Sequence, residues 1–236
     1  MPGFLDYFLS INFALGAGIT LSLTVLSMAL GIAGGLVLAL VKTSGIRFLQ
    51  APADLYIWLF RGTPVLLQLI FIFNALPQMG LRFSAFTSAV IALALNESAY
   101  MAEIIRAGIQ SVDQGQKSAA RVLGLREGQI MRHIVLPQAM RLIIPPTGNQ
   151  FIGMLKMSAL ASVIAVQDLL LRAQRIASAN FDYIDTLIAA AMWYLVLTTL
   201  FTYGQRFLER RMDVTKRRRL VDGSAFADQA LRADAR

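Results

Sequence analysis

The sequence predicts an all-α membrane protein whose helices form a bundle of five transmembrane spans. Hydrophobic residues make up 56% of the 236 residues and charged residues only 15%, well below the ~25% that is usual in soluble domains. Three long runs contain no charged residue: 7–41, 62–81 and 186–205. About 20 such residues cross the ~30 Å hydrocarbon core as a helix. Helices are expected because lipid offers no partner for unpaired backbone amides.

The five spans follow one another along the chain. Lys42 closes the first, Pro52 and Pro77 bound the second, and the Pro145–Pro146 pair opens the fourth. The first twelve residues contain no Lys or Arg, which a cleaved signal peptide would need, so the first span should be retained. We therefore predict an extracytoplasmic segment at residues 1–12 and a transmembrane domain at 13–212. The predicted spans, in order, are 13–41, 55–76, 83–105, 145–166 and 185–203.

Basic residues collect at alternate ends of these spans. They follow the first span, fill the connection between the third and fourth, and follow the fifth, whereas the opposite loops are poor in them or balanced by acids. The positive-inside rule then places the N-terminus outside and the C-terminus inside. The net charge of +8 is mostly this bias, so we expect contact with lipid headgroups and not with nucleic acid. Residues 213–236 are predicted to form a basic, flexible cytoplasmic tail.

Small residues recur at helical spacing in two spans. Gly31 and Gly35 form a GxxxG pair in the first span, and Ala94, Ser98 and Ala102 recur every four residues in the third. Small residues let helices approach closely in lipid, where the hydrophobic effect between helices is weak. Two interpretations remain open: packing within one chain, or contact between two copies.

Ionisable residues inside the weaker spans indicate polar contacts in the membrane. A charge at mid-bilayer costs on the order of 2.5–3.5 kcal/mol, so Glu97 should face a partner or a watery path. Lys156 is the first candidate partner and Arg61 the second. Glu97 therefore belongs either to a structural ion pair or to a substrate path. Glu103 and Arg106 have the spacing of a helical ion pair.

A polar element at about residues 108–137 interrupts the apolar chain. We predict a short helix over residues 116–123, which Gly124 ends because a left-handed residue is favoured there. A second helix should run over 126–136 until Pro137 interrupts it. Ala119 and Ala120 leave room for a partner to approach, and Arg121 gives the short helix a polar edge.

This element resembles the EAA loop of ABC-transporter permeases. That signature is Glu-Ala-Ala, three residues, Gly, nine residues and Ile-x-Leu-Pro. The chain has Ala119-Ala120, Gly124 and Ile134-Val135-Leu136-Pro137 at the same spacing, with Ser118 in place of the Glu. The departure at Ser118 removes any salt link that the Glu would make to an ATPase.

Further motifs are similar to the polar amino-acid branch of these permeases. They are RGTP at residues 61–64, AYMAEIIRAGI at 99–109, LPQA at 136–139 and GNQF at 148–151. The branch usually has a polar or acidic residue after the lysine of the fourth span, where this chain has Lys156-Met157-Ser158. A less ionic recognition of the substrate is therefore expected if Met157 lines the path.

The resemblance implies a five-span permease of the ABC importer (MetI-like) type in a bacterial inner membrane. Two ATP-binding subunits would dock on the short helix, whose candidate coupling residues are Gln116, Ser118, Ala119, Ala120, Arg121, Gly124 and Pro137. A second permease subunit, identical or related, would complete the path, and an extracytoplasmic binding protein would deliver the solute. The candidate path residues are Glu97, Lys156, Met157 and Ser158.

Catalysis by this chain is not expected. No lysine stands in the Gly-Lys-Ser/Thr context of a phosphate-binding loop. The chain has no Cys, and its one histidine, His133, lacks the neighbours of a metal site or triad. We therefore expect no cofactor and no metal. A passive channel or a membrane anchor for another complex is the alternative function.

Overall fold

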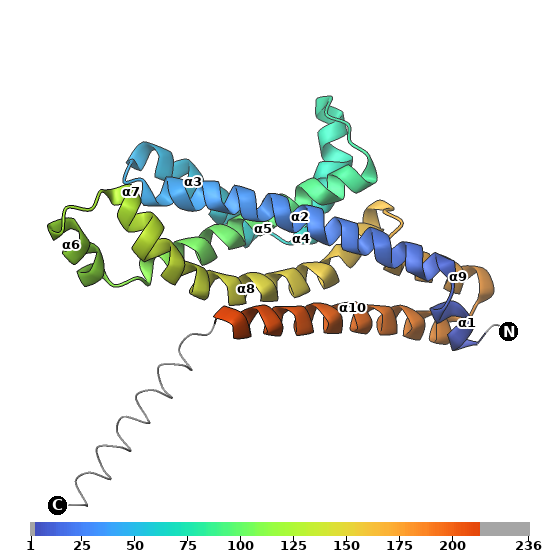
Figure 1. The fold of residues 1–236 in the computed structure, drawn as a ribbon. Helices are drawn as coiled ribbons and strands as arrows, with labels where there is room; N and C mark the ends of the chain where they lie inside the picture. Colours follow the sequence, from blue (N-terminus) through green and yellow to red (C-terminus); the bar gives the residue numbers. More distant parts are fainter. Residues whose placement is uncertain (1–2, 213–236) are drawn as a thin grey trace, which may run out of the picture.

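The computed structural model describes residues 3–212, which form helices joined by short loops and contain no strand. The long helices α2 (Ile11–Thr43), α8 (Leu136–Met157) and α10 (Tyr183–Met212) lie along one axis in Figure 1. Helix α5 (Ala85–Gln110) packs along α2. The tail predicted at 213–236 lies outside the described residues.

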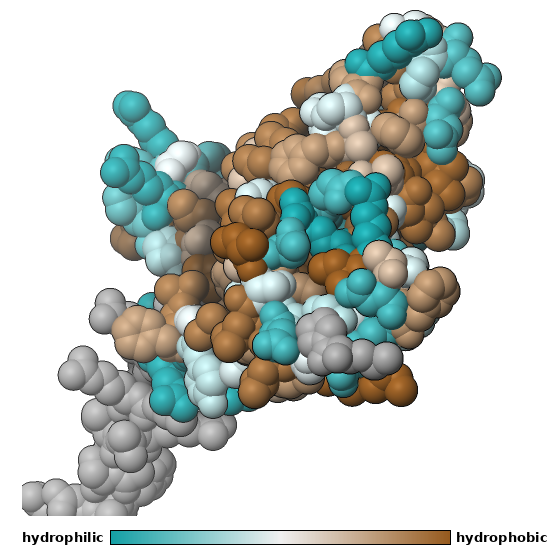
Figure 2. All heavy atoms as spheres, turned by 90° about the vertical axis from the view of Figure 1, so that its right-hand side faces the viewer, coloured by the Kyte–Doolittle hydropathy of each residue, from teal (hydrophilic) through white to brown (hydrophobic). Residues whose placement is uncertain are grey.

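Shorter helices occupy the two ends of this bundle. Helices α1 (Phe4–Phe8) and α9 (Leu169–Asn180) lie at one end, and α6 (Gln114–Val122) and α7 (Glu127–Ile130) at the other (Figure 1). Figure 2 looks onto the end with α1 and α9, where hydrophilic side chains gather between apolar flanks. Polar ends and apolar sides are what a membrane-spanning bundle requires.

Three helices, α2, α5 and α10, are each long and apolar enough to cross a membrane alone. Two further spans are possible if each of two bent helix pairs counts as one. The five-span prediction agrees with this upper count. The helices extend beyond the predicted limits, as α10 does on both sides of residues 185–203.

The second predicted span corresponds to a bent pair of helices. Helix α3 (Arg47–Gly62) contains Pro52 and ends at Gly62, and the chain then turns by 105°. Thr63 is extended, with φ −115° and ψ 146°, because the ring of Pro64 disfavours helical backbone in the preceding residue. The chain continues through α4 (Val65–Ile70), a π-helical turn η1 (Phe71–Ala75) and a 3-10 turn η2 (Leu76–Met79).

The fourth predicted span begins earlier than expected, and Pro137 does not interrupt its helix. Helical backbone runs from α7 through a π-helical turn η3 (Met131–Val135) into α8, which contains Pro145 and Pro146. It then continues into the 3-10 segment η4 (Ser158–Ile164). Pro137 lies directly after the π-helical turn η3, and such a turn accommodates a residue that lacks a backbone N–H donor within a continuous helix.

The small residues of α2 and α5 pack against one another. A Cβ atom added to Gly31 would lie 2.7 Å from the Cβ atom of Glu97, and one added to Gly35 would lie 2.5 Å from that of Met101. Ser98 and Ala102 are buried in the same interface. This arrangement confirms the interpretation as packing within one chain, which brings the α2 and α5 backbones close together.

Candidate functional site

Helix α6 is held at both ends by local hydrogen bonds. The Asp113 carboxylate accepts a bond from the Gln116 amide at 3.0 Å, which caps the N-terminus. Gly124 adopts φ +81°, its amide donates to the Arg121 carbonyl at 2.9 Å, and the Leu125 amide donates to the Ala120 carbonyl at 3.1 Å. These two bonds form a Schellman motif, and they confirm the prediction that Gly124 ends the helix.

An ion pair closes the turn between α6 and α7. The Arg121 guanidinium donates from Nε to Glu127 Oε1 at 2.5 Å and from Nη2 to Oε2 at 3.2 Å. Both side chains are exposed. The arginine predicted to give the short helix a polar edge therefore pairs with Glu127 on the exposed surface.

Side chains also tie α6 to the bundle. Gln138 on α8 donates to the Gln116 side chain at 2.7 Å, and Lys117 Nζ donates to the Ile109 carbonyl on α5 at 3.4 Å. The Ala120 side chain is 4% exposed and belongs to a core cluster with Val112 and Ile130. A displacement of α6 would consequently act on both α5 and α8.

The outer surface of α6 is apolar at its C-terminal end. Val122 is 88% exposed and Leu123 is 79% exposed, and the predicted residues Ser118 and Ala119 are exposed as well. Ala120 does not share this surface, since it is buried. Sequence reasoning missed Val122 and Leu123, although two aliphatic residues at the end of a polar helix are a readable signal of an interaction surface.

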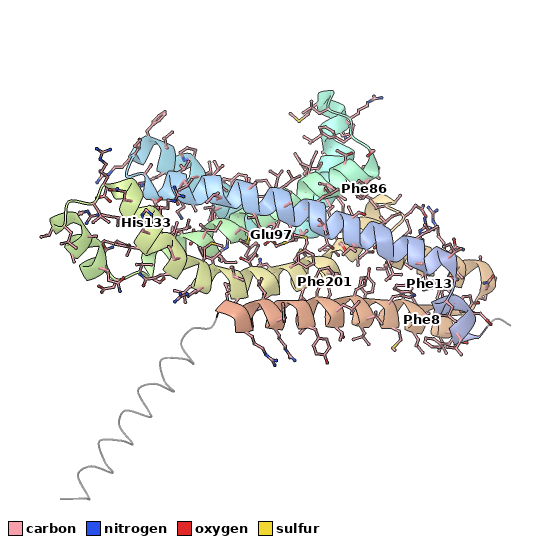
Figure 3. All side chains as sticks on the ribbon, in the orientation of Figure 1. Phe8, Phe13, Phe86, Glu97, His133 and Phe201 are labelled. Carbon is pink, nitrogen blue, oxygen red and sulfur yellow. The ribbon has the colours of Figure 1, made fainter. Side chains whose placement is uncertain are left out.

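A second polar site lies in the middle of the bundle. Glu97 on α5 is 2% exposed and lies between α2 and α8 in Figure 3. Its carboxylate accepts from Gln150 Nε2 of α8 at 3.3 Å and 3.5 Å. The predicted partners, Lys156 and Arg61, are both wrong: Lys156 is exposed, and the Arg61 guanidinium lies 5.3 Å from the centroid of the Tyr100 ring.

The remaining candidate path residues do not join Glu97. Met157 packs beside the buried cluster of Met28, Leu93 and Met154. Ser158 is buried and donates its hydroxyl to the Leu155 carbonyl at 2.8 Å. Within residues 3–212, no hydrogen bond or ion pair links either residue or Lys156 to Glu97. The polar pair at mid-bundle is thus Glu97 with Gln150.

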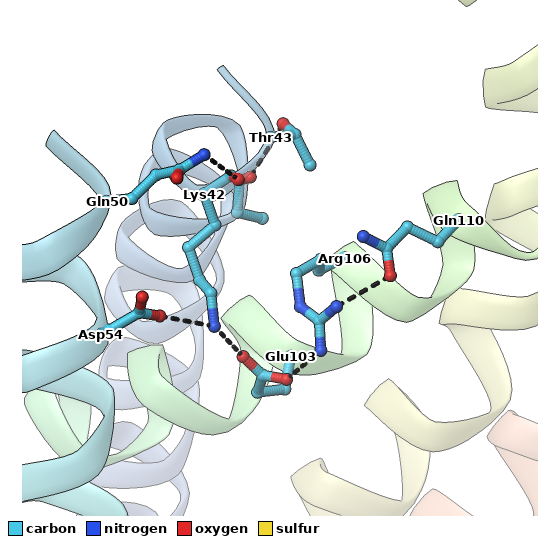
Figure 4. Close-up of polar contacts among 8 residues, drawn as sticks. Lys42, Thr43, Gln50, Asp54, Glu103, Arg106 and Gln110 are labelled. Atoms are coloured by element: carbon cyan, nitrogen blue, oxygen red, sulfur yellow. Dashed lines mark hydrogen bonds and ion pairs between the residues drawn. The ribbon is translucent and has the colours of Figure 1, made fainter. Parts of the chain in front are cut away.

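Charged residues also connect three helices near α6. Lys42 Nζ of α2 lies 2.9 Å from Asp54 Oδ1 of α3 and 2.8 Å from Glu103 Oε1 of α5, as Figure 4 shows. Arg106 Nη2 lies 2.5 Å from Glu103 Oε2, which confirms the predicted helical ion pair. The sequence did not predict that Lys42 and Asp54 join the Glu103–Arg106 pair. We call these four residues the Lys42 network.

The sequence matches the family of binding-protein-dependent transport system inner membrane components over residues 31–214. It is 41% identical to the arginine transport system permease protein ArgU of Corynebacterium glutamicum, over 92% of this chain and 73% of that protein. It is also 41% identical to the arginine transport system permease protein ArtQ of Bacillus subtilis, over 84% of this chain and 90% of that protein.

Solved structures share the fold. A chain of an amino acid ABC transporter crystallised with histidines is 46% identical, with a TM-score of 0.80 over 85% of this chain and 94% of that one. The inward-facing MetNI methionine ABC transporter aligns with a TM-score of 0.69 over 85% of this chain and 95% of that one, at 19% identity. The second likeness concerns the fold alone.

Proposed function

Because this chain belongs to the family of binding-protein-dependent transport system inner membrane components, we propose that α6 transmits the action of an ATPase to the spans. The chain is a non-catalytic permease subunit of an ABC amino-acid importer and a multi-pass inner-membrane protein. An ATPase and a solute-binding protein are its partners in such a complex. The N-terminus faces outward and the C-terminus inward, so that α6 lies in the cytoplasm.

The exposed apolar end of α6 carries this proposal. Val122 and Leu123 are almost fully exposed on a helix whose other end is capped and polar. Aliphatic side chains held this rigidly outside the membrane favour a protein partner that buries them. The Schellman turn and the bonds to α5 and α8 keep the helix in place, so a force applied to it reaches the spans.

The complete assembly contains two such permease subunits, identical or related, and two ATP-binding subunits. Each ATPase receives one α6, including Gln116, Ser118 and Ala119 on its exposed surface. ATP binding draws the ATPases together, and the docked helices convey that movement to the spans. The pathway then alternates between facing outward and facing inward. The extracytoplasmic binding protein delivers the solute to the end with α1 and α9.

A Gly124→Pro variant tests the coupling. Proline fixes φ near −65°, so it cannot adopt the +81° of Gly124, and α6 loses its terminal turn. We expect membrane insertion to survive while ATP-driven uptake and ATPase co-purification are lost. Gly128→Ala is the matched control, since no heavy atom lies within 4 Å of a Cβ at that position. Normal uptake by the Gly124→Pro variant would contradict the assignment.

A passive channel or a membrane anchor predicts a different result. Neither function requires an ATPase, so uptake would proceed without ATP, or would not occur at all, and no ATPase would co-purify with the wild-type chain. Proteoliposomes that contain the chain with and without its ATPase separate these outcomes directly.

The solute is a polar amino acid, and Glu97 with Gln150 provides polar contacts beside its path. The relatives named for arginine transport support this class of solute. Met157 packs beside the buried cluster of Met28, Leu93 and Met154. Along the chain, Lys156, Met157 and Ser158 follow Gln150 by about two helical turns. A Met157→Asp variant adds a carboxylate there and should shift uptake toward cationic amino acids. An unchanged substrate profile would remove Met157 from the path.

A further inference from the structure

Arg61 is an arginine of the second span whose guanidinium has no acidic partner. It is the last residue but one of α3, and its side chain is exposed. Within residues 3–212 it forms none of the ion pairs, and its guanidinium lies over the Tyr100 ring, 5.3 Å from the centroid. An unpaired cation inside a membrane is costly and faces a partner or water. The partner of Arg61 must therefore be an anion from outside the described chain.

Contacts of α3 with α5 fix the depth of Arg61 in the bundle. The carbonyl of the preceding residue, Phe60, accepts a hydrogen bond from Asn96 Nδ2 of α5 at 2.8 Å. Asn96 precedes Glu97, which lies in the middle of the bundle in Figure 3. On the same helix, Asp54 joins the Lys42 network seven residues before Arg61, about 10 Å along the axis at ~1.5 Å per residue. The backbone of Arg61 is therefore level with Glu97 and lies well inside the membrane.

Buried side chains hold the helix break that follows Arg61. The chain turns by 105° there, and Pro64 has no amide hydrogen to donate to the Phe60 carbonyl four residues earlier. Gln68 Nε2 donates instead, to the Phe60 carbonyl at 3.0 Å and to the Thr63 carbonyl at 3.2 Å. Gln68 and Asn96 are both buried, so water does not compete for these bonds. The end of α3 that carries Arg61 is consequently fixed in position.

The Tyr100 ring orients the guanidinium without using its hydrogen-bond donors. Tyr100 is half-buried on α5, which is the most buried of the three helices long enough to span a membrane alone. A cation over an aromatic face is attracted by the ring. The N–H donors of a guanidinium lie in its plane and match the two oxygens of a carboxylate. Arg61 is therefore held in place with its fork available to a carboxylate.

We propose that Arg61 binds the α-carboxylate of the amino acid as the solute passes through the permease. This inference rests on the proposed function and adds a specificity-determining residue to it. Every free amino acid carries this carboxylate, so Arg61 selects amino acids as a class, and other residues recognise the solute side chain. Tyr100 positions the guanidinium, while Gln68 and Asn96 position the backbone that carries it.

Binding of an amino acid and of its decarboxylated analogue tests the proposal. The probes are L-arginine with agmatine and L-histidine with histamine, measured by equilibrium binding to the permease–ATPase complex in nanodiscs without ATP. We expect Arg61→Gln to weaken binding of the amino acid about tenfold to hundredfold, since a hydrogen bond between charged groups is lost. Binding of the amine should not change. Equal losses for both members of a pair would overturn the proposal, as would a wild type that binds the amino acid no more tightly than the amine.

Matched variants separate the charge, the fork and the orientation of Arg61. Arg61→Lys keeps the charge but offers no planar fork, so affinity for the amino acid should recover only in part. Tyr100→Leu removes the cation–π contact and should lower that affinity about two- to fivefold, whereas Tyr100→Phe keeps the ring and should bind as the wild type does. Arg82→Gln is the control, because it removes an exposed arginine from the loop before α5. A loss at Arg82→Gln equal to that at Arg61→Gln would contradict the assignment.

A lipid phosphate is the competing anion for Arg61. If the guanidinium reaches a headgroup, Arg61→Gln will leave amino-acid binding unchanged and will lower the retention of phosphatidylglycerol in native mass spectrometry, which would overturn the proposal. Thermal midpoints distinguish loss of binding from loss of fold, and the two Tyr100 variants decide the question if Arg61→Gln fails to assemble. An ATPase that does not co-purify with the wild type would instead refute the proposed function as a whole.

Discussion

The α2–α5 interface and the α8–α10 contact are both formed by long apolar helices, yet the first closes and the second does not. On α2, Gly31 and Gly35 face Cβ and backbone atoms of α5. On α8, Gly148 faces the far end of the Gln205 side chain, and an apolar crevice lined by Phe151 and Phe201 remains beside it, between α8 and α10. Small residues therefore bring these helices together where they meet atoms fixed to the opposing backbone, and not where they meet the end of a flexible side chain.

The largest loss of folding stability is expected from a substitution in the closed α2–α5 interface. A Cβ on Gly35 would meet the Met101 Cβ at 2.5 Å and the Ala102 amide nitrogen at 2.9 Å. Gly35→Ala should lower the free energy of unfolding by roughly 1–3 kcal/mol, despite a gain of up to ~1 kcal/mol in helix propensity. The thermal midpoint in detergent measures this change. Gly18→Ala on the same helix, where no atom lies within 4 Å, should be neutral or stabilising; equal losses in both variants would refute the packing argument.

Substitutions of Glu97 test whether its carboxylate stabilises the fold or acts on the solute. Glu97→Ala leaves the Gln150 amide without its partner, which costs about 1–3 kcal/mol. Glu97→Gln keeps an acceptor for that amide and should preserve most of the stability. Uptake assays then separate the two roles: if Glu97→Gln is stable but transports poorly, the carboxylate acts on the solute. Normal uptake together with normal stability would place Glu97 in packing alone.

The Lys42 network should contribute less to the free energy of unfolding than the packing of Gly31 and Gly35 does. Its members are partly exposed, and such ion pairs contribute about 0–1 kcal/mol. Lys42→Met keeps the aliphatic part of the side chain but removes both ion pairs. The thermal midpoint should fall slightly at low salt and converge with that of the wild type at high salt. A loss that is unchanged by salt would mean that packing, and not charge, connects these helices.

The smallest change in folding stability is expected from a substitution in the open α8–α10 contact. Gly148→Ala would collide only with the Gln205 side chain, which can rotate away at the cost of its bonds to Pro145 and Asn149. Better helix propensity offsets that loss, so the net change should stay within ~0.5 kcal/mol. A loss as large as that of Gly35→Ala would show that α8 and α10 are as tightly closed as α2 and α5.

Local chemistry made part of this structure predictable. Gly124 ends α6 as expected because the left-handed backbone is a property of one residue and its neighbours. Glu103 and Arg106 pair because three residues bring them to one side of a single helix. The EAA-like spacing from Ala119 to Pro137 covers α6, α7 and the turn between them, which one continuous segment encodes.

Features that depend on the placement of two elements were not predictable. Lys156 follows Gln150 by six residues, which is about 240° around a helix of ~3.6 residues per turn. The helix face that meets Glu97 therefore presents Gln150 and turns Lys156 away, and nothing in the sequence fixes that rotation. The turn at Thr63–Pro64 was readable from the Gly-Thr-Pro run, but its 105° angle was not. Continuous helix through Pro137 depended on the π-helical turn that precedes it.

The Lys42 network has a physical consequence that the glycine contacts lack. Attraction between partly exposed charges weakens as dissolved ions screen it, over ~10 Å at 0.1 M salt, whereas van der Waals packing at Gly31 and Gly35 is insensitive to electrolyte. The stiffness with which α2, α3 and α5 move as one body near α6 is therefore set partly by the aqueous solution at that end. When the salt content of that solution rises, these three helices become looser there while the middle of the bundle keeps its rigidity.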